Sequence, residues 1–264
     1  MKITALIENT AGNSACAVEH GLSLYVETDR HKILFDAGQS GLFAHNAEKL
    51  GIDLAQVDVA VLSHGHFDHA GGMTAFLRKN KHARIYANRG FSKPHYNPEQ
   101  RYIGVEPPLI GSQRVVCTDD YLQLDDQLTL FTCNQQDLIQ PIQSYGMTEE
   151  TNETLRPDQF LHEQYLRIQE GDTTVLLSGC THKGICNLMH WIQPLGIQVL
   201  IGGFHFMKIE PENYEILDQA AQELMQYPVT YYTCHCTGQM QYHYLKGKMG
   251  DQLHYLAAGE SIQL

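Results

Sequence analysis

The sequence predicts a layered α/β sandwich that forms a single domain over residues 1–264. Short β-type runs fill the first third of the chain, and the last third alternates helical and strand patterns. No repeat, linker or low-complexity tract divides the chain. Strands followed by α/β alternation are typical of sheets that are covered by helices. The 43% share of hydrophobic residues is enough for a buried core of this kind.

The first third of the chain is expected to form a sheet with its own covering helices. Short apolar runs bounded by turn residues are typical of strands, and apolar residues at helical spacing predict helices. Gly51 is placed to end one of these helices. The patterns predict strands at 3–7, 22–27, 32–36, 57–62 and 84–87, and helices at 41–50 and 72–79.

The last third is expected to form a second sheet with helices between its strands. A Glu-Gly-Asp turn at 170–172 joins two β-type runs and predicts a hairpin. Pro211 suits the first turn of the clearest helix, because the first turn needs no N–H from it. The patterns predict strands at 164–168, 173–177, 198–201, 229–233 and 253–257, and helices at 184–193, 211–226 and 238–246.

The charge balance points away from nucleic acids. The chain has 18 Lys and Arg against 30 Asp and Glu, so its formal net charge is −12. Binding to phosphate backbones normally needs a basic surface, so we expect a small-molecule substrate. There is no apolar run of about 18 residues and no signal-type apolar core, so we expect neither a membrane span nor export. The seven cysteines, odd in number and scattered, agree with a location in the cytoplasm.

The strongest chemical signal follows the predicted strand at 57–62. Four ligand-type side chains fall within six residues as His-x-His-x-Asp-His: His64, His66, Asp68 and His69. A core strand would not hold such groups without partners, and a solvated loop has no need of them. Alternation along an extended chain directs the first two imidazoles toward one cation, and a bend lets the other two residues address a second cation. The segment predicts a two-metal site, with Asp68 also at the reacting centre.

This segment resembles the hallmark of the metallo-β-lactamase superfamily. Further motifs resemble a subgroup often labelled after the archaeal dihydropterin ribofuranosyl-aminobenzene phosphate synthase. They occur in this order: Asn9-Thr10, His20-Gly21-Leu22-Ser23, Leu34-Phe35-Asp36-Ala37-Gly38, Ser178-Gly179-Cys180-Thr181-His182-Lys183-Gly184-Ile185, Gly202-Gly203-Phe204-His205 and His235-Cys236-Thr237-Gly238. The resemblance covers most of the chain outside about 88–160. It implies an αβ/βα four-layer sandwich.

The resemblance also implies the remaining metal ligands. His162 lies where a third histidine of the first metal is expected, with His95 as the competing candidate. Cys180 stands where an aspartate would bridge the metals; its thiolate can bind, or point away and leave a weaker bridge. His235 matches the last ligand of the second metal. The cofactors expected are two divalent metal ions, with zinc first and iron or manganese as alternatives.

Other residues of these motifs are expected to support the site. His182 and His205 follow strands in glycine-flanked turns, which suggests substrate contact or proton transfer; ordinary hydrogen-bonded histidines are the alternative. Asp36 is expected to orient a ligand imidazole, and His20 could reach the site similarly. Cys234 and Cys236 are interpreted as facing the core, with a role as metal ligands as the alternative.

Together these features predict a metal-dependent hydrolase that activates water at a dinuclear site. The substrate would be a small-molecule phosphoester, thioester or related compound. The alternative is a metal-bound small-molecule sensor or binding protein with little turnover. An oxygen-reducing iron enzyme is a third interpretation, but it normally needs a flavin partner domain.

Residues from about 88 to 160 are expected to form a substrate-covering insertion or lid. Six prolines interrupt them, strand patterns are present only at 115–117 and 128–132, and long irregular segments in compact domains are usually binding loops. The alternative is a solvated excursion. We expect the segment to supply no metal ligand, so that shortening it would preserve the metals. It offers three tyrosines for an aromatic ligand and three cations for an anion: Tyr96, Tyr102, Tyr145, Arg89, Lys93 and Arg101.

Overall fold

The first half of the chain forms most of a seven-stranded sheet in the computed structural model, which describes residues 1–264. The strand order is β17-β1-β2-β3-β4-β5-β7. The strands are β1 (Lys2–Ile7), β2 (Ser23–Glu27), β3 (Lys32–Phe35), β4 (Val59–Leu62), β5 (Arg84–Asn88), β7 (Val115–Thr118) and β17 (Ser261–Gln263). From β3 to β7 the pairing is parallel. The loops that follow β3 and β4 therefore leave the sheet at the same edge.

The second half forms a seven-stranded sheet of matching design. Its order is β16-β15-β14-β13-β12-β9-β8. The strands are β8 (Tyr121–Gln123), β9 (Leu128–Phe131), β12 (Tyr165–Glu170), β13 (Thr173–Leu177), β14 (Val199–Ile201), β15 (Thr230–Thr233) and β16 (Leu253–Tyr255). The strands β13 to β16 are parallel, so the turns after β13, β14 and β15 also share an edge.

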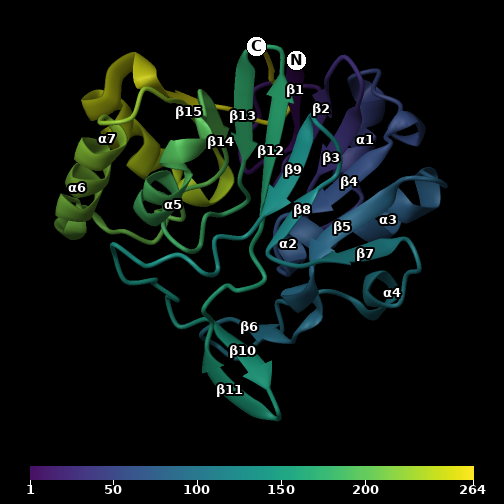
Figure 1. Cartoon of the computed structure of the whole chain (residues 1–264), viewed down its shortest axis with the longest axis horizontal. Helices are drawn as coiled ribbons and strands as arrows, with labels where there is room; N and C mark the ends of the chain where they lie inside the picture. Colours follow the sequence, from purple (N-terminus) through teal and green to yellow (C-terminus); the bar gives the residue numbers. More distant parts are fainter.

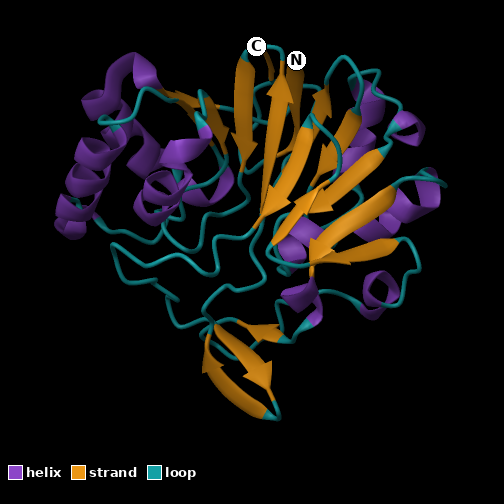
Figure 2. Ribbon diagram, in the orientation of Figure 1, coloured by secondary structure: helices purple, strands orange, loops and turns teal.

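Helices cover the outer face of each sheet, as Figures 1 and 2 show. The first sheet is covered by α1 (Leu42–Lys49), α3 (Met73–Lys79) and α4 (Pro107–Ile110), and the second by α5 (Ile185–Ile192), α6 (Glu215–Leu224) and α7 (Gln239–Met249). Two apolar clusters lie between helices and sheets, and a third lies between the two sheets. The predicted αβ/βα four-layer sandwich is confirmed.

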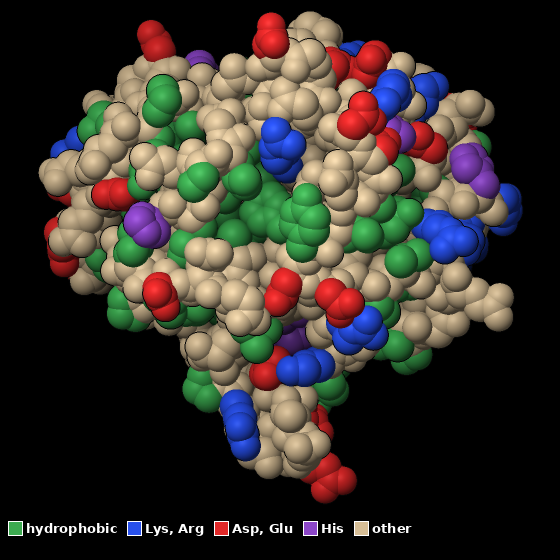
Figure 3. Space-filling view, viewed as in Figure 1, with side chains coloured by type: hydrophobic (Ala, Val, Ile, Leu, Met, Phe, Trp, Pro, Cys, Tyr) green, Lys and Arg blue, Asp and Glu red, His purple; other side chains and the backbone are tan.

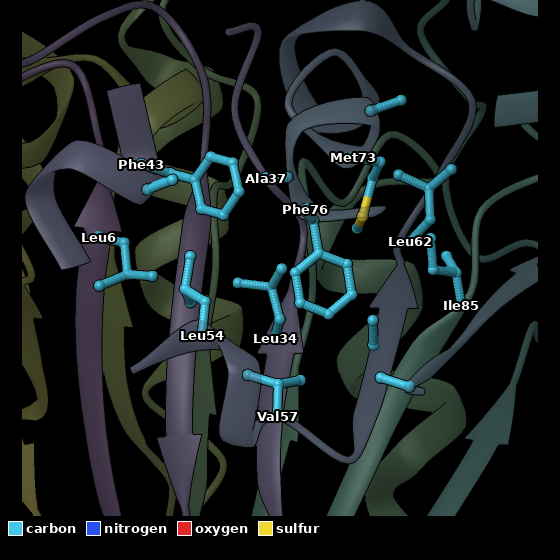
Figure 4. Close-up of a cluster of buried hydrophobic side chains, with 14 of the residues drawn as sticks. Leu6, Leu34, Ala37, Phe43, Leu54, Val57, Leu62, Met73, Phe76 and Ile85 are labelled. Atoms are coloured by element: carbon cyan, nitrogen blue, oxygen red, sulfur yellow. The ribbon is translucent and has the colours of Figure 1, made fainter. Parts of the chain in front are cut away.

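Figure 4 shows why the first helical layer stays on its sheet. Phe43 of α1 and Met73 and Phe76 of α3 are completely buried, and they pack against Leu34 and Leu62 of the sheet. Burying a side chain of this size contributes about 1.5–3 kcal/mol. The segment that links α1 to α3 contains the metal-type histidines, so this packing fixes both ends of that segment.

The middle of the chain contains the two strands that its sequence predicts at 115–117 and 128–132, as β7 and β9, and further strands that it does not predict. Strands β7, β8 and β9 join the two main sheets, so 115–131 belongs to the sandwich. The rest contributes a three-stranded sheet of β6 (His95–Tyr96), β10 (Thr148–Thr151) and β11 (Thr154–Pro157), whose hairpin projects from the body in Figure 1. Strands β10 and β11 are polar and at most half-buried, so no hydrophobic alternation marked them.

Two helix boundaries differ from the sequence prediction. The helix expected at 211–226 is a 3-10 turn, Pro211–Asn213, followed by α6. The helix expected to end at 246 continues to Met249, where Gly250 adopts a positive φ of 55°. Helix ends are the least certain part of such a prediction because single turns fray and tighten easily. None of the helices combines the length and the hydrophobicity that crossing a membrane would require.

Candidate metal centre

The predicted site residues meet where both sheets present the carboxyl ends of their parallel strands. The metal-type loop follows β4, Cys180 and His182 follow β13, and His235 follows β15. All are at most 8% exposed: His64, His66, Asp68, His69, Cys180, His182 and His235. Ligand sites of α/β proteins commonly form at this edge.

The loop after β4 bends so that its four ligand-type residues point in different directions. The chain stays extended through His66 and then forms one helical turn, α2 (Phe67–Ala70), which carries Asp68 and His69. Gly72 permits this bend, because a Cβ there would overlap with the carbonyl oxygen of Ala37.

A buried carboxylate, Asp36, determines which ring nitrogens of two histidines remain free. Ser63 donates its hydroxyl to Asp36 Oδ2 at 2.6 Å, so it can only accept from His64 Nδ1, 2.8 Å away. His69 Nδ1 lies 2.7 Å from the same Oδ2 and donates to it. Both rings therefore carry their proton on Nδ1 and present the lone pair of Nε2 to the site.

His235 is held in the same way by an amide. Its Nδ1 donates to Asn9 Oδ1 at 2.8 Å, and its Nε2 is buried without a hydrogen-bond partner. The Asn9 amide group lies 3.2 Å from His20 Nδ1 and donates to it. The His20 proton is then on Nε2, which lies 3.3 Å from Asp68 Oδ2. The expectation that Asp36 and His20 reach the site agrees with these contacts.

The free Nε2 lone pairs point toward other atoms that can bind a metal. His64 Nε2 lies 3.2 Å from His182 Nε2, His69 Nε2 lies 3.1 Å from Cys180 Sγ, and His235 Nε2 lies 3.3 Å from Asp68 Oδ2. A proton on His182 Nε2 can form a hydrogen bond to His64, and a proton on Cys180 Sγ can form one to His69. Cations in their place would leave every supporting hydrogen bond intact. The donor set, imidazoles with one carboxylate and one thiol, fits two transition-metal ions.

The protonation states also suit metal binding. Burial lowers the pKa of His64 well below its usual value and lowers that of His235 to about 4, so both are neutral near pH 7. Burial opposes the charge of Asp68, but the neighbouring imidazoles hold its pKa well below the usual range. Burial raises the pKa of the Cys180 thiol well above its usual value. Neutral imidazole and carboxylate are the metal-binding forms, and the thiol must lose its proton.

The structure brings His182, rather than His162, to the first pair of imidazoles. The donor atoms of His64, His66 and His182 all lie within 4.8 Å of one another. His162 Nδ1 accepts the N–H of Gly65 at 2.9 Å, so its proton is on Nε2, directed at Asp158 Oδ2. Both of its nitrogens are therefore engaged by the protein. The metal role of His162 stays a prediction, but this geometry favours His182 as the third imidazole.

The middle segment reaches the site through a cluster that the sequence interpretation missed. Asp158 Oδ2 lies 2.8 Å from His95 Nδ1, 3.3 Å from His162 Nε2 and 3.9 Å from His66 Nε2. Burial opposes its charge, but hydrogen bonds from the three imidazoles hold the pKa of Asp158 well below its usual value. The position of Asp158 four residues before His162 is the only sequence signal for this contact.

Glu163 fixes the turn that carries His182. Its carboxylate accepts the backbone N–H of His182 at 2.7 Å, that of Lys183 at 3.2 Å, and the hydroxyl of Tyr165. Lys183 is buried, and its Nζ donates to the carbonyls of Thr132 and Glu163; burial lowers its pKa. Two buried ionisable residues behind the site were not expected from the sequence, where both resemble surface positions.

A cavity of about 490 Å³ opens beside His182. Apolar groups and amides line most of it, His182 and His205 lie at its wall, and Lys208 is its only lysine or arginine. His205 packs between His182 and Tyr145, with ring centroids 4.4 and 5.2 Å away. Burial lowers the pKa of His205 to about 3. The histidines predicted for substrate contact therefore both face the cavity.

Most side chains expected to recognise the substrate lie elsewhere. Tyr145 lines the cavity, but Tyr96 donates to Glu150 and Tyr102 to a nearby carbonyl. Arg89 pairs with Asp119 and Lys93 with Glu149. These ion pairs border a separate cleft of about 360 Å³ that reaches His162. Figure 3 shows acidic and basic side chains close together on the lower half of this face of the molecule.

Comparison with known proteins finds similarity to one superfamily. The family described as the metallo-β-lactamase superfamily matches residues 17–131, which include the metal-type loop. The 7,8-dihydropterin-6-methyl-4-(β-D-ribofuranosyl)-aminobenzene-5'-phosphate synthase of Methanocaldococcus jannaschii is 26% identical, over 100% of this chain and 96% of its own length.

Solved structures show the same fold. The structure of Tm1679, described as a metal-dependent hydrolase of the β-lactamase superfamily, has a TM-score of 0.86 and 26% identity, covering 100% of this chain and 99% of its own. Zn²⁺-bound PqqB from Methylobacterium extorquens has a TM-score of 0.60 at 10% identity and full coverage of both chains, a likeness of fold alone. In its motif and its fold, the chain is therefore similar to proteins of the metallo-β-lactamase superfamily.

Proposed function

We propose that the protein is a metal-dependent hydrolase that acts on a small molecule at a dinuclear centre. The observation that carries the proposal is the arrangement of His64, His69 and His235. Each ring has its Nδ1–H held by the protein and its Nε2 lone pair turned toward another donor atom. Hydrogen-bonded support of this kind is a regular feature of metal-binding imidazoles.

The residues divide between two metal positions. His64, His66 and His182 would hold the first cation, and Asp68, His69 and His235 the second, with Cys180 between them. Two divalent cations there would supply a water with its pKa lowered toward ~7 and would polarise the substrate oxygen. The chain's own contribution is to fix these side chains by hydrogen bonds and to keep the centre buried. Zinc is the first expectation, and iron or manganese the alternatives.

His205 is proposed to move a proton between the cavity and the centre. Its backbone has a φ of 57°, a conformation that costs energy for a residue with a side chain and is concentrated at functional sites. The ring faces the cavity beside His182. It is neutral near pH 7, but its low pKa makes it a weak base, so proton transfer through it would depend on negative charge that develops on the reacting group beside it.

A phosphoester is the substrate class proposed first, with a thioester as the second. The synthase relative is named for a phosphorylated dihydropterin compound, and this supports a phosphorylated small molecule. Lys208 is the only fixed cation in the cavity, so a phosphoryl group would depend mainly on the metals for charge compensation. No nucleic-acid partner is proposed, because the net charge is −12.

The relative's name also motivates a second candidate, group transfer of the synthase type. The match spans this whole chain, and the same metals and proton carrier would serve transfer to an acceptor other than water. Products formed in the presence of amine and alcohol acceptors would separate the two. A sensor with little turnover, the alternative from the sequence, predicts tight ligand binding without product.

The test begins with metal-free protein reconstituted with zinc, manganese or iron(II). We expect about two cations per chain and turnover of a phosphodiester, thioester or lactone in a substrate panel. Asp68→Ala should lower kcat/KM by roughly 100-fold or more. His243→Ala, which changes an exposed histidine of α7, should alter neither metal content nor rate. Less than half an equivalent of any transition metal in the reconstituted protein would contradict the proposal.

A further inference from the structure

Two cysteines flank His235, and they lie in different environments. Cys234 belongs to the apolar cluster between the two sheets. Cys236 is absent from all three apolar clusters, although it is only 2% exposed. Instead its Sγ lies 3.5 Å from the carbonyl oxygen of Cys180. The two neighbours therefore have different surroundings, and only Cys236 is directed toward the metal centre.

The backbone at His235 explains why adjacent side chains can share the centre. In a strand, consecutive side chains point to opposite faces. His235 has a φ of 47°, and it begins the 3-10 turn His235–Thr237, so the alternation stops at this residue. Backbone N–H groups hold the turn at both ends: Phe204 donates to Thr237 Oγ1 at 2.8 Å, and His235 donates to Glu8 Oε1 at 2.6 Å.

Gly203 provides the space for the sulfur of Cys236. A Cβ at this position would overlap with Cys236 Sγ, so only glycine accommodates the thiol there. The turn after β14 is thereby shaped around a sulfur atom that no apolar cluster includes. A cysteine that served only as a small apolar residue would not need this arrangement.

Three donor atoms form a compact group at this point. Those of Cys180, His235 and Cys236 lie within 4.8 Å of one another, and all three residues are at most 3% exposed. His235 Nδ1 is already bonded to Asn9, and its Nε2 is buried without a partner. The group thus combines two sulfurs with an imidazole lone pair, a donor set typical of zinc and other thiophilic cations.

We propose that Cys236 is a further ligand of the second metal position, and that Cys180 and Cys236 together give this position a two-thiolate character. The inference rests on the proposed dinuclear centre and goes beyond it, because it assigns a ligand and a metal preference. Sulfur ligands select zinc, cobalt(II) or cadmium, whereas manganese and magnesium prefer oxygen. Each thiol loses its proton to solvent as the cation binds, so charge is balanced at the metal.

Cobalt(II) absorption tests the proposal without relying on activity. Thiolate bonded to cobalt(II) gives a charge-transfer band in the near ultraviolet, whereas imidazole and carboxylate ligands do not. The cobalt-loaded full-length protein should show the band. Cys236→Ser should reduce it to about half, because one of two thiolates is lost. Cys234→Ala is the matched control, and its band should be unchanged per cobalt bound.

The outcomes separate this inference from the proposed function. A Cys236→Ser protein with an unchanged band per cobalt would overturn the Cys236 assignment and leave the dinuclear centre in place. Failure of the full-length chain to bind cobalt or zinc would overturn both. X-ray absorption at the zinc edge of the wild-type protein gives a second measurement that needs no variant. It should show on average at least one sulfur per zinc at about 2.3 Å; zinc with only nitrogen and oxygen neighbours would contradict the proposal.

Discussion

Two groups of buried histidines lie side by side in this protein and differ in their hydrogen bonds. In the metal centre, His64, His69 and His235 each have one nitrogen held by the protein and one lone pair free. In the neighbouring cluster, His162 has both nitrogens engaged, by Gly65 and Asp158. Burial is equally complete in both groups. The partners of the ring nitrogens, rather than burial, therefore distinguish His162 from these three histidines, whereas His95 of the same cluster has Nδ1 on Asp158 and Nε2 without a partner.

The largest effect should come from replacing, one at a time, the two candidates for the third imidazole. We expect His182→Ala to lose about one equivalent of metal, since two imidazoles hold a cation poorly, and to lose activity by roughly 100-fold. His162→Ala should keep both cations and be less stable by about 1–3 kcal/mol, because Gly65 N–H and Asp158 lose a partner. Metal analysis and thermal unfolding give the two readouts. Loss of a cation from His162→Ala alone would restore the assignment based on sequence.

The next effect tests the hydrogen bonds that hold the free lone pairs in place. Three donors point at Asp36: the N–H and hydroxyl of Ser63 and the ring N–H of His69. In Asp36→Asn an NH₂ group would face one of them, so metal affinity should fall 10- to 100-fold. Asp53→Asn, which changes a carboxylate that caps the turn after α1, is the control. Competition with a coloured chelator measures the affinity, and equal values for the two variants would contradict the role given to Asp36.

A smaller effect is expected at Glu163, which positions His182 through its backbone. Glu163→Gln keeps the shape but directs an NH₂ group at the N–H of His182 or Lys183. The resulting shift of the imidazole should lower kcat by about 10-fold with little change in KM. Steady-state kinetics at equal metal loading would show this. A fall in thermal stability with kcat unchanged would mean that Glu163 supports the fold alone.

The smallest effect concerns a third kind of histidine, one that donates from both nitrogens. His31 Nδ1 lies 2.8 Å from Asp58 and its Nε2 2.7 Å from Asp125. Burial opposes its charge, but these bonds raise the pKa of His31 above 6.5. Its contribution, about 1 kcal/mol or less, is therefore full below the unfolded pKa and lost as pH rises through the folded one. His31→Asn should lower Tm at about pH 5.5 and hardly change it at about pH 8.5. An equal decrease in Tm at both pH values would contradict the predicted pH dependence.

The sequence predicted the fold well because its signals were local. Apolar runs and helical spacing marked most strands of both sheets, and the His-x-His-x-Asp-His segment marked the metal loop. The hairpin of β10 and β11 could not be predicted in this way, since its polar strands bury little apolar surface. Its turn, with positive φ at Asn152 and Glu153, has no glycine to signal it.

The site was predictable only where ligands adjoin in sequence. The sequence does not show whether His162 or His182 completes the first position. The choice depends on the Gly65 N–H and the Asp158 carboxylate, which contact the His162 ring only in the folded structure. The same limit applies to the middle segment, which was expected to contribute nothing to the metals. Through His95 and Asp158 it contacts His66, so a shortened version should keep Asp158 and remove only the projecting hairpin.

Asp36 also links the two proposed metal positions to each other. The same oxygen of its carboxylate accepts from Ser63, which supports His64 of one position, and from His69 of the other. A metal ion in either position is therefore supported by hydrogen bonds to the same carboxylate oxygen. By thermodynamic reciprocity, whatever the first ion does to the affinity for the second, the second does equally to the first. The affinities of the two positions should therefore be coupled, and loss of the Asp36 carboxylate should weaken both of them.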